Sequence, residues 1–488
     1  MDLISLLETY TEIPFQNCRI TDIQNDSRKI KKGDLFLAYK GALADGRDFI
    51  EKAIDLGASA IGYQPGKLSI RDDYYHKVPF VAIPNLPKLL SDIAAKFYAY
   101  PAKNLKITGV TGTNGKTTIA FQLAIALELL GKNSAYIGTL GEGKISELTN
   151  IPNTTPDAIY LQKLFADYLK DNVTNVCMEV SSHALRQGRV DNIDFNQAIY
   201  TNLSHDHLDY HHTMQAYAKA KSLLFQFSSL ETAILNIDDD YFSVMEKKIP
   251  KTCQRITYGF SEHADVRASN CQFSFSGSKF LLKSHFGEQQ IEIKSLGLFN
   301  VYNSLAIYSS LIMSGFSHLD VVNVMGKLPP STGRMEIVAK KPCVVIDFAH
   351  SPDALQKVLQ AILYLRDSNH LNSKIWVIFG CGGDRDNLKR PVMGKIASQA
   401  ADYVVLTSDN PRTEDPERII DEIASGLLIT AKALKIVDRK MAIEEVLKIA
   451  SPEDIVLIAG KGHEDYQIIG TNKFKFSDKE LVRCFLHC

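Results

Sequence analysis

The stretch GVTGTNGKTT, residues 109–118, is the starting point for interpreting this sequence. It overlaps an apolar run at 106–111 that predicts a strand, and it leads into residues 117–130, where apolar side chains recur at helical spacing. The predicted apolar face of that helix consists of Ile119, Leu123, Ala126 and Leu127, and Gly131 is a typical C-terminal stop. The sequence therefore predicts a strand, a glycine-rich loop and a helix in succession.

This loop has the composition of a phosphate-binding loop. Glycines allow backbone N–H groups to turn toward phosphate oxygens, and the start of a helix adds partial positive charge. Lys116 would reach the β- and γ-phosphates, and Thr117 would offer its hydroxyl to Mg²⁺. The spacing is a variant, because Val110 stands where the usual motif has its first glycine. A turn without ligand would not require this lysine and threonine, so we predict an ATP site made by Gly112, Thr113, Asn114, Gly115, Lys116, Thr117 and Thr118.

Composition limits the class of protein. A chain of 488 residues is too long for one hydrophobic core, and we predict three domains. The 55 basic and 56 acidic residues create no overall field for nucleic acid or an anionic membrane, and no stretch has the ~18 apolar residues of a membrane span. The eight cysteines show no zinc spacing, and the first residues lack the basic flank of a secretory signal. We therefore expect a cytoplasmic protein with reduced thiols and no nucleic-acid partner.

Short apolar runs ending in polar clusters recur along the chain, each followed by helical periodicity. Examples are KITGVTG, NVCMEVSSH, QAIYTNLSHDH, TAILNIDD, VVIDFAHSPDA, WVIFGCGGDRD, YVVLTSDNPR and IVLIAGKGHED. This alternation predicts an α/β fold whose parallel sheets bind ligands beyond the strand C-termini. Breaks at Tyr100-Pro101 and PPSTGR divide it into a small N-terminal α/β domain (1–103), a central P-loop parallel-sheet ATPase-like domain (104–333) and a C-terminal Rossmann-like domain (334–488).

Two of these clusters suggest a metal site. Glu179 ends an apolar strand, where burial of its carboxylate requires a cation, either Mg²⁺ or a salt-bridge partner. His207, Asp209 and His211 would supply or orient a metal ligand, although three such residues are more often a solvated loop, and zinc is not proposed.

Two further clusters stay open on chemistry alone. By spacing, Lys219 and Lys221 belong to the solvated face of a helix. Asn236, Asp238 and Asp239 suit an adenine edge or a helix N-cap equally.

A set of motifs in fixed order carries a resemblance to a known family. They are GTNGKTT (112–118), NTTPDA (153–158), EVSSHAL (179–185), TNLSHDHLDYH (201–211), LNIDD (235–239), GLFNVYN (297–303), STGRME (331–336), DFAHSPDAL (347–355), GCGGDRD (380–386), SDNPRTEDP (408–416) and GKGHED (460–465). Together they cover nearly the whole chain, which resembles the Mur ligase family of peptidoglycan synthesis. DSRKIKKGDLFLAYKG, residues 26–41, resembles the members that add the third peptide residue.

The resemblance implies an acid–amino-acid ligase acting in cell-wall synthesis, and so in cell shape and division. ATP would phosphorylate a carboxylate, an amine would displace the phosphate from the resulting acyl phosphate, and ADP would be the other product. Metal ions and a lysine would stabilise the charge. The catalytic residues would be Lys116, Glu179, His207 and Lys221, with one Mg²⁺ on Thr117 and Glu179 and a second on His207 and Lys221 carbamylated by CO₂. The carbamate replaces the solvated role that spacing suggests for Lys221.

Ligand positions follow from the same resemblance. Those that would hold the UDP-muramoyl dipeptide are Asn25, Ser27, Ala42, Leu43, Ala44, Asn153, Thr154, Thr155, Ser181, Gln187 and Arg189. Further ATP positions would be Asn236, Asn300, Asn303 and Arg334, approached by the 347–350 loop. Ala42 and Leu43 stand where some relatives have polar residues, which suggests backbone contacts only. Loops after Phe299 and Gly333 are predicted hinges, because an acyl phosphate must be shielded from water.

The amino-acid substrate would be meso-2,6-diaminopimelate, which differs from lysine by an extra carboxylate. A guanidinium grips a carboxylate with two parallel hydrogen bonds, and Arg412 in DNPR would supply it. The matching positions are Arg385, Asp409, Asn410, Pro411, Arg412, Gly460 and Glu464, with Glu464 meeting the distal ammonium. The same segment also predicts an Asn-Pro turn and a helix that begins at Pro416 with Asp415 as its cap; both interpretations can hold.

Other functions share parts of this pattern. A folylpolyglutamate-synthase-like ligase or another Mur ligase would share GTNGKT and the metal residues, but DSRKIKKGDLFLAYKG and DNPR disfavour both. An L-lysine-adding Mur ligase is the remaining alternative, and Arg412 in DNPR disfavours it. In an NTPase motor or switch we would expect a strand that ends in Asp beside the metal, whereas the corresponding strand of this chain ends in Glu179. A scaffold protein that only binds nucleotide would not need Lys116 and Lys221 intact. We expect a monomer acting on ATP, UDP-MurNAc-L-Ala-D-Glu and diaminopimelate.

Overall fold

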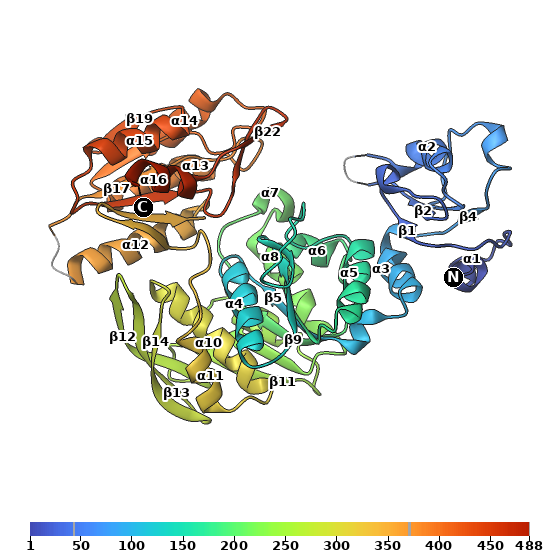
Figure 1. The fold of residues 1–488 in the computed structure, drawn as a ribbon, viewed down its shortest axis with the longest axis horizontal. Coiled ribbons are helices and arrows are strands. Elements are labelled where there is room, and N and C mark those ends of the chain that lie inside the picture. Colours follow the sequence, from blue (N-terminus) through green and yellow to red (C-terminus); the bar gives the residue numbers. More distant parts are fainter. Residues whose placement is uncertain (42–43, 369–371, 488) are drawn as a thin grey trace. The chain divides into compact units, whose positions relative to one another are not determined.

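The computed structural model describes residues 1–41, 44–368 and 372–487 (Figure 1). The chain falls into two compact units, residues 1–108 with 133–196 and residues 109–132 with 197–488. The division passes within two strands, β5 (Lys106–Thr111) and β9 (Phe195–Tyr200). The domain boundaries predicted after residues 103 and 333 are not tested by this division and stay predictions.

The first unit begins with a small parallel sheet. Its strands, in spatial order, are β1 (Ile23–Gln24), β2 (Leu35–Ala38), β3 (Ala60–Tyr63) and β4 (Phe80–Ala82). The helices of this part are α1 (Leu3–Leu7), α2 (Ile50–Asp55) and α3 (Leu86–Phe97). Alternate residues of β2 serve two cores, Leu35 and Leu37 with α1 and α3, and Phe36 and Ala38 with α2. Both faces of the sheet are therefore covered, as parallel sheets require.

The rest of the first unit contributes a second group of strands. These are β6 (Ser134–Gly138), β7 (Gly141–Gly143) and β8 (Asn175–Glu179), with β6 between the other two, parallel to β8 and antiparallel to β7. The helices are α5 (Ala158–Lys170) and α6 (Ser182–Arg186). The carboxylate of Glu179 thus lies at the C-terminal end of β8, where the sequence predicts it.

The second unit opens with α4 (Lys116–Leu129), which starts and ends one residue before the predicted helix. Its predicted apolar face is buried, and Gly131 follows with φ +78°. The further strands are β10 (Thr232–Asn236), β11 (Gln254–Gly259), β12 (Val266–Ser274), β13 (Gly277–Ser284) and β14 (Gly287–Ile293). The helices are α7 (Leu208–His211), α8 (Met214–Ser222), α9 (Phe242–Glu246), α10 (Leu298–Met313) and α11 (His318–Met325). Strands β9, β10, β11 and β12 are parallel, and β12, β13 and β14 form an antiparallel meander.

The C-terminal part of this unit holds a six-stranded sheet. In spatial order its strands are β15 (Glu336–Lys340), β16 (Cys343–Asp347), β20 (Ile455–Ala459), β17 (Ile375–Phe379), β18 (Tyr403–Leu406) and β19 (Lys432–Lys435), all parallel except β15. The helices are α12 (Pro352–Ser368), α13 (Lys389–Ala400), α14 (Pro416–Ala424), α15 (Arg439–Ile449) and α16 (Asp478–Leu486), and a hairpin joins β21 (Tyr466–Ile469) to β22 (Asn472–Lys475).

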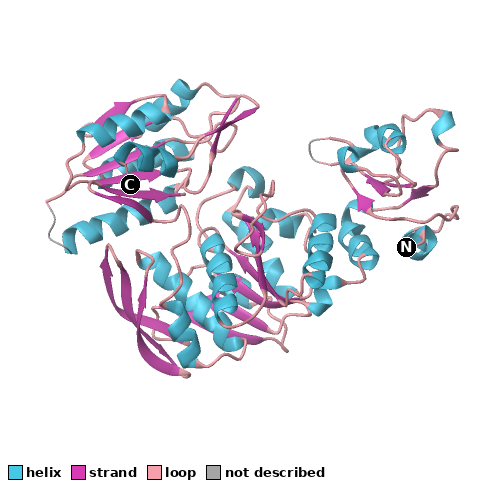
Figure 2. Cartoon of the chain, viewed as in Figure 1, coloured by secondary structure: helices cyan, strands magenta, loops and turns pink. Residues whose placement is uncertain are grey.

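Apolar side chains that alternate along these strands point to opposite faces of the sheet, which explains why helices cover both faces of it (Figure 2). Val345 and Leu457 belong to the core shared with α12, α13 and α14, whereas Val344 and Val456 belong to the core shared with α15 and α16. The predicted α/β fold with parallel sheets is confirmed. Short 3₁₀ helices lie at Glu8–Tyr10, Ser27–Lys29, Gly46–Phe49, Asp72–Tyr74, Pro101–Asn104 and Leu223–Gln226. Within the described ranges, no helix combines the length and apolar character needed to cross a bilayer.

Candidate active site

The glycine-rich loop between β5 and α4 packs closely against neighbouring side chains. Gly112 has φ +151°, and a Cβ there would lie 1.8 Å from Thr201 Oγ1. Gly115 has φ +88°, and a Cβ there would lie 2.6 Å from Asn303 Oδ1. These two positions therefore require glycine for conformation and for space. The N–H of Thr113 donates to the carbonyl of Asn202 (2.8 Å), which fixes the loop on the chain after β9.

Two lysines meet on one carbonyl of this loop. Lys116 Nζ donates to Gly112 O (2.9 Å) and Thr113 O (2.8 Å), and Lys221 Nζ donates to Gly112 O (2.6 Å). Lys221 is 1% exposed, and its amine lies 4.5 Å from the centre of the Tyr217 ring. Burial, with the charge of Lys116, holds the pKa of Lys221 well below its usual range. The solvated role that spacing suggests is wrong for Lys221 because α8 turns this residue inward.

The other predicted metal ligands lie in both units. In the second unit, Thr117 is buried and its hydroxyl accepts a hydrogen bond from Arg334 Nη2 (3.4 Å). His207 precedes α7 with φ +53°, and its Nε2 lies 3.5 Å from Asp206 Oδ2. In the first unit, Glu179 Oε1 accepts hydrogen bonds from Tyr136 Oη (2.6 Å) and from a backbone N–H (2.8 Å). Over the described residues, no group of three or more His, Cys, Asp or Glu side chains is arranged to hold a metal.

One histidine of this segment departs from the predicted solvated loop, whereas His207 and His212 are exposed, as that prediction requires. His211 is only 5% exposed and stacks on Tyr217, with ring centres 4.9 Å apart. The side chain of Asp209 lies outside the described structure. Lys219, in contrast to Lys221, is exposed, as its spacing predicts. The aromatic packing of His211 therefore fixes the segment that leads from His207 to Lys221.

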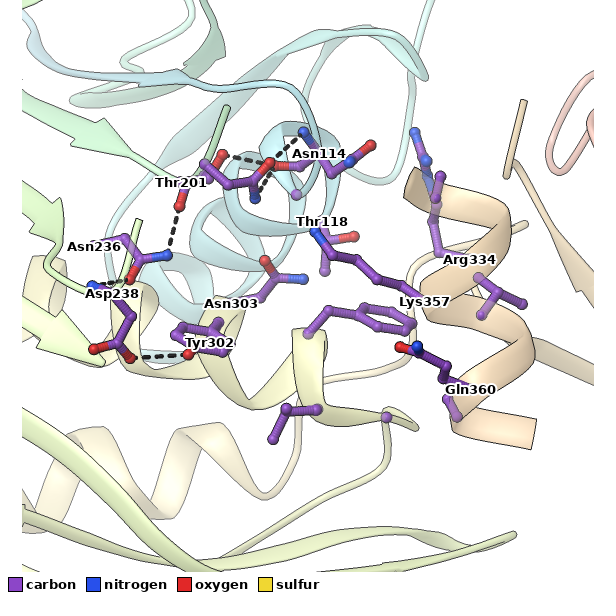
Figure 3. Close-up of a pocket in the computed structure, with 18 of the residues that line it drawn as sticks. Asn114, Thr118, Thr201, Asn236, Asp238, Tyr302, Asn303, Arg334, Lys357 and Gln360 are labelled. Atoms are coloured by element: carbon purple, nitrogen blue, oxygen red, sulfur yellow. Dashed lines mark hydrogen bonds between the residues drawn. The ribbon is translucent and has the colours of Figure 1, made fainter. Parts of the chain in front are cut away.

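A cavity of about 580 Å³ opens beside the phosphate loop, within the second unit (Figure 3). Its lining includes six of the predicted ATP positions: Asn114, Gly115, Thr118, Asn236, Asn303 and Arg334. Figure 3 shows Asn114 and Thr118, from the phosphate loop and α4, together with Lys357 and Gln360 from α12. Asp353 of α12 accepts hydrogen bonds from Asn114 Nδ2 (2.8 Å) and from Lys357 Nζ (2.9 Å). The cavity has the size of a nucleotide site.

Sequence reasoning missed a second set of residues that line this cavity. They include Phe273, Tyr302, Lys357 and Tyr364, which come from β12, α10 and α12. Phe273 and Tyr364 meet edge to face, with ring centres 5.1 Å apart. Tyr302 lies within GLFNVYN (297–303), although no role was predicted for it. Phe273, Lys357 and Tyr364 belong to no motif, so their place follows only from the way β12 and α12 pack together.

The polar residues after β10 mainly brace the chain. Asn236 Nδ2 donates to Thr201 O (2.7 Å), and Asn236 Oδ1 accepts from the Asp238 N–H (3.1 Å). Asp239 accepts from Tyr200 Oη (2.5 Å). These three residues also line the cavity, and the N-cap of the following helix α9 is Tyr241, so an adenine edge and a helix cap both stay predictions for this cluster. On α10, Asn300 Nδ2 donates to Leu296 O (2.7 Å) and Asn300 Oδ1 accepts from Asn303 Nδ2 (2.9 Å), which directs Asn303 Oδ1 toward Gly115.

Arg334 links the loop after residue 333 to the phosphate loop. Its guanidinium lies 4.6 Å from the centre of the Phe348 ring and reaches Thr117. The neighbouring carboxyl of Asp347 accepts from the Met335 N–H (2.7 Å). Burial raises the pKa of Asp347 to about 6, and the Arg334 charge opposes that rise. The predicted 347–350 loop therefore does border the cavity.

Most residues predicted for the UDP-muramoyl dipeptide lie in the first unit in two groups. Asn25, Ser27 and Ala44 line a cavity of about 530 Å³, where Asn25 Nδ2 donates to Tyr39 Oη (3.2 Å). In the second group, Thr155 Oγ1 accepts from the Ser181 N–H (3.0 Å), and Arg189 donates to Thr155 O (2.8 Å) and to Gln187 Oε1 (3.0 Å). Thr154 Oγ1 lies 3.2 Å from Thr139 Oγ1, and Asn153 is exposed. Ala42 and Leu43 lie outside the described residues.

The predicted amino-acid residues gather at the C-terminal ends of β17, β18 and β20. Arg412 has φ +50°, a strained conformation for this residue, and its backbone is fixed by hydrogen bonds to Ile468 O (3.1 Å) and from the Gly470 N–H (2.7 Å). Its Nη1 donates to Gly383 O (2.7 Å). Burial and the nearby Arg385 lower the pKa of Arg412. Two adjacent guanidinium groups are stabilised when an anion binds between them.

The anionic side of this site is held by a lysine that sequence reasoning missed. Lys461 is fully buried and donates to Asn410 Oδ1 (3.2 Å) and Glu464 Oε2 (2.9 Å), and it lies 3.8 Å from Asp409 Oδ1. Asn410 Nδ2 also donates to Glu464 Oε2 (3.0 Å). Asp409 and Asn410 therefore belong with Glu464, as predicted. Gly460, at φ +112°, would bring a Cβ to 2.9 Å from Asp409 Oδ2.

Two buried arginines, each paired with one or more carboxylates, support these loops. Arg439 pairs with Asp478 (2.7 Å), both fully buried, and it donates to Ala459 O (3.0 Å) and Ser408 O (3.4 Å). Arg390 pairs with Glu414 and Glu422 and donates to Gly382 O (3.1 Å). Helix α14 begins at Pro416 with Asp415 accepting from the Glu417 N–H (3.0 Å), so the predicted cap is confirmed.

The class of protein follows from comparison with family models. The chain matches the Mur ligase middle domain over residues 110–310, the Mur ligase glutamate ligase domain over 333–462 and the Mur ligase catalytic domain over 19–98. It belongs to the Mur ligase family.

Individual relatives narrow the similarity. The chain is 41% identical over 466 residues to UDP-N-acetylmuramoyl-L-alanyl-D-glutamate–2,6-diaminopimelate ligase of Neisseria meningitidis serogroup B, covering 94% of this chain and 93% of that protein. A solved structure of a ligase of that name is 37% identical, with a TM-score of 0.67 over 96% of this chain and 95% of that one. The MurF ligase of Thermotoga maritima in complex with ADP is 16% identical, with a TM-score of 0.62 over 90% and 93%, and shares the fold.

Proposed function

We propose that this chain is an ATP-dependent ligase that joins meso-2,6-diaminopimelate to the D-Glu γ-carboxylate of UDP-MurNAc-L-Ala-D-Glu in peptidoglycan precursor synthesis. Two relatives that are 41% and 37% identical to this chain carry that activity in their names. The observation that carries the proposal is Arg412, held beside Arg385 at a strand end together with Asp409 and Glu464. The two arginines would bind a carboxylate of the substrate, and the two carboxylates would bind its ammonium.

The reaction proceeds in two steps that balance. The bond between the γ-phosphorus and the β–γ bridging oxygen of ATP breaks as a carboxylate oxygen bonds to that phosphorus, giving ADP and an acyl phosphate. The amine of diaminopimelate then attacks the acyl carbon, phosphate leaves and the amine loses a proton. Lys116 and Arg334 stand where they would bind phosphate oxygens during both steps, since both contact the phosphate loop.

One Mg²⁺ would be held by Thr117 and Glu179, and a second by His207 and a carbamate on Lys221. The metal supplies neutralisation of the charge on triphosphate and carboxylate. Lys221 suits carbamylation because its amine is buried and shares the Gly112 carbonyl with Lys116. Addition of CO₂ to the neutral amine forms a C–N bond and releases a proton, and the resulting anion would pair with Lys116 instead of repelling it.

Each of three regions of the chain would bind one of the three substrates. Residues 1–103 would bind the uridine end, 104–333 would bind ATP, and 334–488 would bind the incoming amino acid. The 530 Å³ and 580 Å³ cavities support the first two assignments, and the Arg412 site supports the third. We propose that the chain works as a monomer in the cytoplasm, where ATP and the nucleotide-linked precursor are available.

A single assay tests this function. The protein is incubated with Mg-ATP, UDP-MurNAc-L-Ala-D-Glu and either meso-diaminopimelate or L-lysine, and the nucleotide-linked product is identified by mass spectrometry. We expect the diaminopimelate adduct and one ADP per adduct. An equal yield of the lysine adduct would contradict the role of Arg412, and ATP hydrolysis without any adduct would contradict the ligase.

A further inference from the structure

The amino-acid site contains a lysine, Lys461, whose complete burial is unusual for a charged side chain. Lys461 is fully buried, and its ammonium lies within 4 Å of both Asp409 and Glu464. A buried lysine is costly unless it is paired and hydrogen-bonded, and here it contacts two carboxylates and the Asn410 amide. Lys461 therefore belongs to the site rather than to the surrounding core.

Lys461 determines which oxygen of Glu464 a substrate can reach. Glu464 Oε2 accepts from both Lys461 Nζ (2.9 Å) and Asn410 Nδ2 (3.0 Å). Glu464 Oε1 accepts only a long hydrogen bond from Tyr466 Oη (3.4 Å) among the described contacts. With one oxygen held on the protein, the side chain is fixed and Oε1 is presented to a ligand ammonium.

Lys461 also sets the charge of the site. Without it, Asp409 and Glu464 would place two carboxylates in front of the incoming amino acid, an arrangement suited to a lone ammonium. With it, the three side chains carry one net negative charge, and the positive charges of Arg412 and Arg385 lie nearby. A head group that carries both a carboxylate and an ammonium matches this balance better than an ammonium alone.

We propose that Lys461 is a positioning residue that makes the site select a zwitterionic head group over a simple amine. This inference rests on the proposed function, because it concerns the distal end of the amino-acid substrate. Lys461 acts through Glu464 and Asn410 and does not itself contact the ligand.

The wild-type protein provides the first test. Two compounds each lack one distal group of diaminopimelate: 2-aminopimelate lacks the ammonium, and L-lysine lacks the carboxylate. We expect kcat/KM to fall in the order diaminopimelate, 2-aminopimelate, L-lysine, with the last two separated by about tenfold, which corresponds to ~1.4 kcal/mol. Equal values, or L-lysine above 2-aminopimelate, would overturn the inference.

The second test is Lys461→Met, which removes the charge and keeps much of the side-chain length. We expect KM for diaminopimelate to rise about tenfold while KM for ATP stays within about twofold, and the preference for diaminopimelate over L-lysine to fall about tenfold. The control is Lys473→Met, whose exposed ammonium lies 3.5 Å from the centre of the Tyr466 ring on the same lobe. It should leave these constants unchanged.

The outcomes separate this inference from the function on which it rests. If a folded Lys461→Met variant keeps the wild-type preference, or loses kcat with every substrate alike, Lys461 is structural only and the inference is wrong. If this variant does not fold, Lys461→Gln takes its place, because it removes the charge and keeps a donor for Glu464; an unchanged preference for diaminopimelate over L-lysine then overturns the inference. If the wild-type protein makes no adduct from diaminopimelate, the proposed function itself fails.

Discussion

The phosphate loop and the amino-acid site handle charge in opposite ways. At the phosphate loop, Lys116 and Lys221 donate to one backbone carbonyl, that of Gly112, and a triphosphate would bring the negative charge. At the amino-acid site, Lys461 already pairs with Asp409 and Glu464. We propose that the first site attracts an anion by its positive charge, whereas the second selects between similar amino acids by the arrangement of its paired charges. The difference suggests that mutations at the first site reduce turnover and mutations at the second change selectivity.

The largest expected effect comes from Lys116→Ala. Loss of a cation that binds the transferred phosphoryl group should lower kcat for adduct formation by at least about 10³-fold. The measurement is ADP release coupled to adduct formation at saturating substrates. Retention of more than a tenth of wild-type turnover would show that the phosphate loop does not work by charge.

Lys221→Ala should have an effect nearly as large, because it removes the proposed carbamate. We expect turnover to fall by about 10²–10³-fold while the circular dichroism spectrum and the melting temperature stay close to wild type. Lys219→Ala is the control, since Lys219 is exposed on the same helix. Comparable activity in the two variants would remove the carbamate from the proposal.

Asp478→Ala tests how much the buried Arg439–Asp478 ion pair, which lies beside the loops of the amino-acid site, contributes to stability. The change leaves the fully buried Arg439 guanidinium without its partner, so the free energy of unfolding should fall by about 3–5 kcal/mol. The control is Asp421→Ala, which breaks an exposed ion pair with Lys435 and should cost less than about 1 kcal/mol. Urea denaturation of both variants measures the difference, and similar midpoints would contradict it.

Arg412→Lys tests selectivity directly. The lysine keeps the charge but loses the two parallel hydrogen bonds to a carboxylate, which should cost about 1.5–3 kcal/mol, or roughly 10- to 100-fold in kcat/KM for diaminopimelate. L-Lysine should be affected much less. Arg418→Lys, on the exposed face of α14, is the control. An equal loss with both amino acids would mean that Arg412 does not bind the extra carboxylate.

Asp347 should give the smallest effect, and one that depends on pH. Its pKa is raised by burial from an ordinary 3.8 to about 6, so the folded protein binds more protons than the unfolded chain between these values. Stability from this group is fully present below pH 3.8 and is lost as pH rises through about 6, by up to about 3 kcal/mol in total.

The Asp347→Asn variant isolates that contribution. Its free energy of unfolding, relative to wild type, should rise between pH 4 and pH 6 by up to ~2 kcal/mol and then level off. Exposed Asp240→Asn is the control. A constant difference between wild type and Asp347→Asn across this range would contradict the buried, protonated carboxyl.

The sequence pattern predicted helices, strands and caps correctly where residues adjacent in the sequence decide the conformation. The strand at 106–111 occurs at those residues, the helix after it starts within one residue, and Asp415 caps α14. These features depend on apolar alternation, glycine conformation and a capping side chain. Each of these acts over a few residues.

Contacts between distant segments decided the rest. Helical spacing assigned Lys221 to solvent, but α8 packs that face against the phosphate loop more than a hundred residues earlier. Lys461 was overlooked because its partners belong to the loops after β18 and β20, which only the parallel sheet brings together. Phe273 and Lys357 line the nucleotide cavity without belonging to any motif.

The sequence by itself determined the alternation of strands and helices, the phosphate loop and the family, because these depend on short motifs in a fixed order. Only the tertiary structure decided which lysines are buried, which oxygen of Glu464 is held by Lys461 and Asn410, and which side chains line the cavity. Burial and pairing depend on what packs against a residue, and that partner comes from elsewhere in the chain.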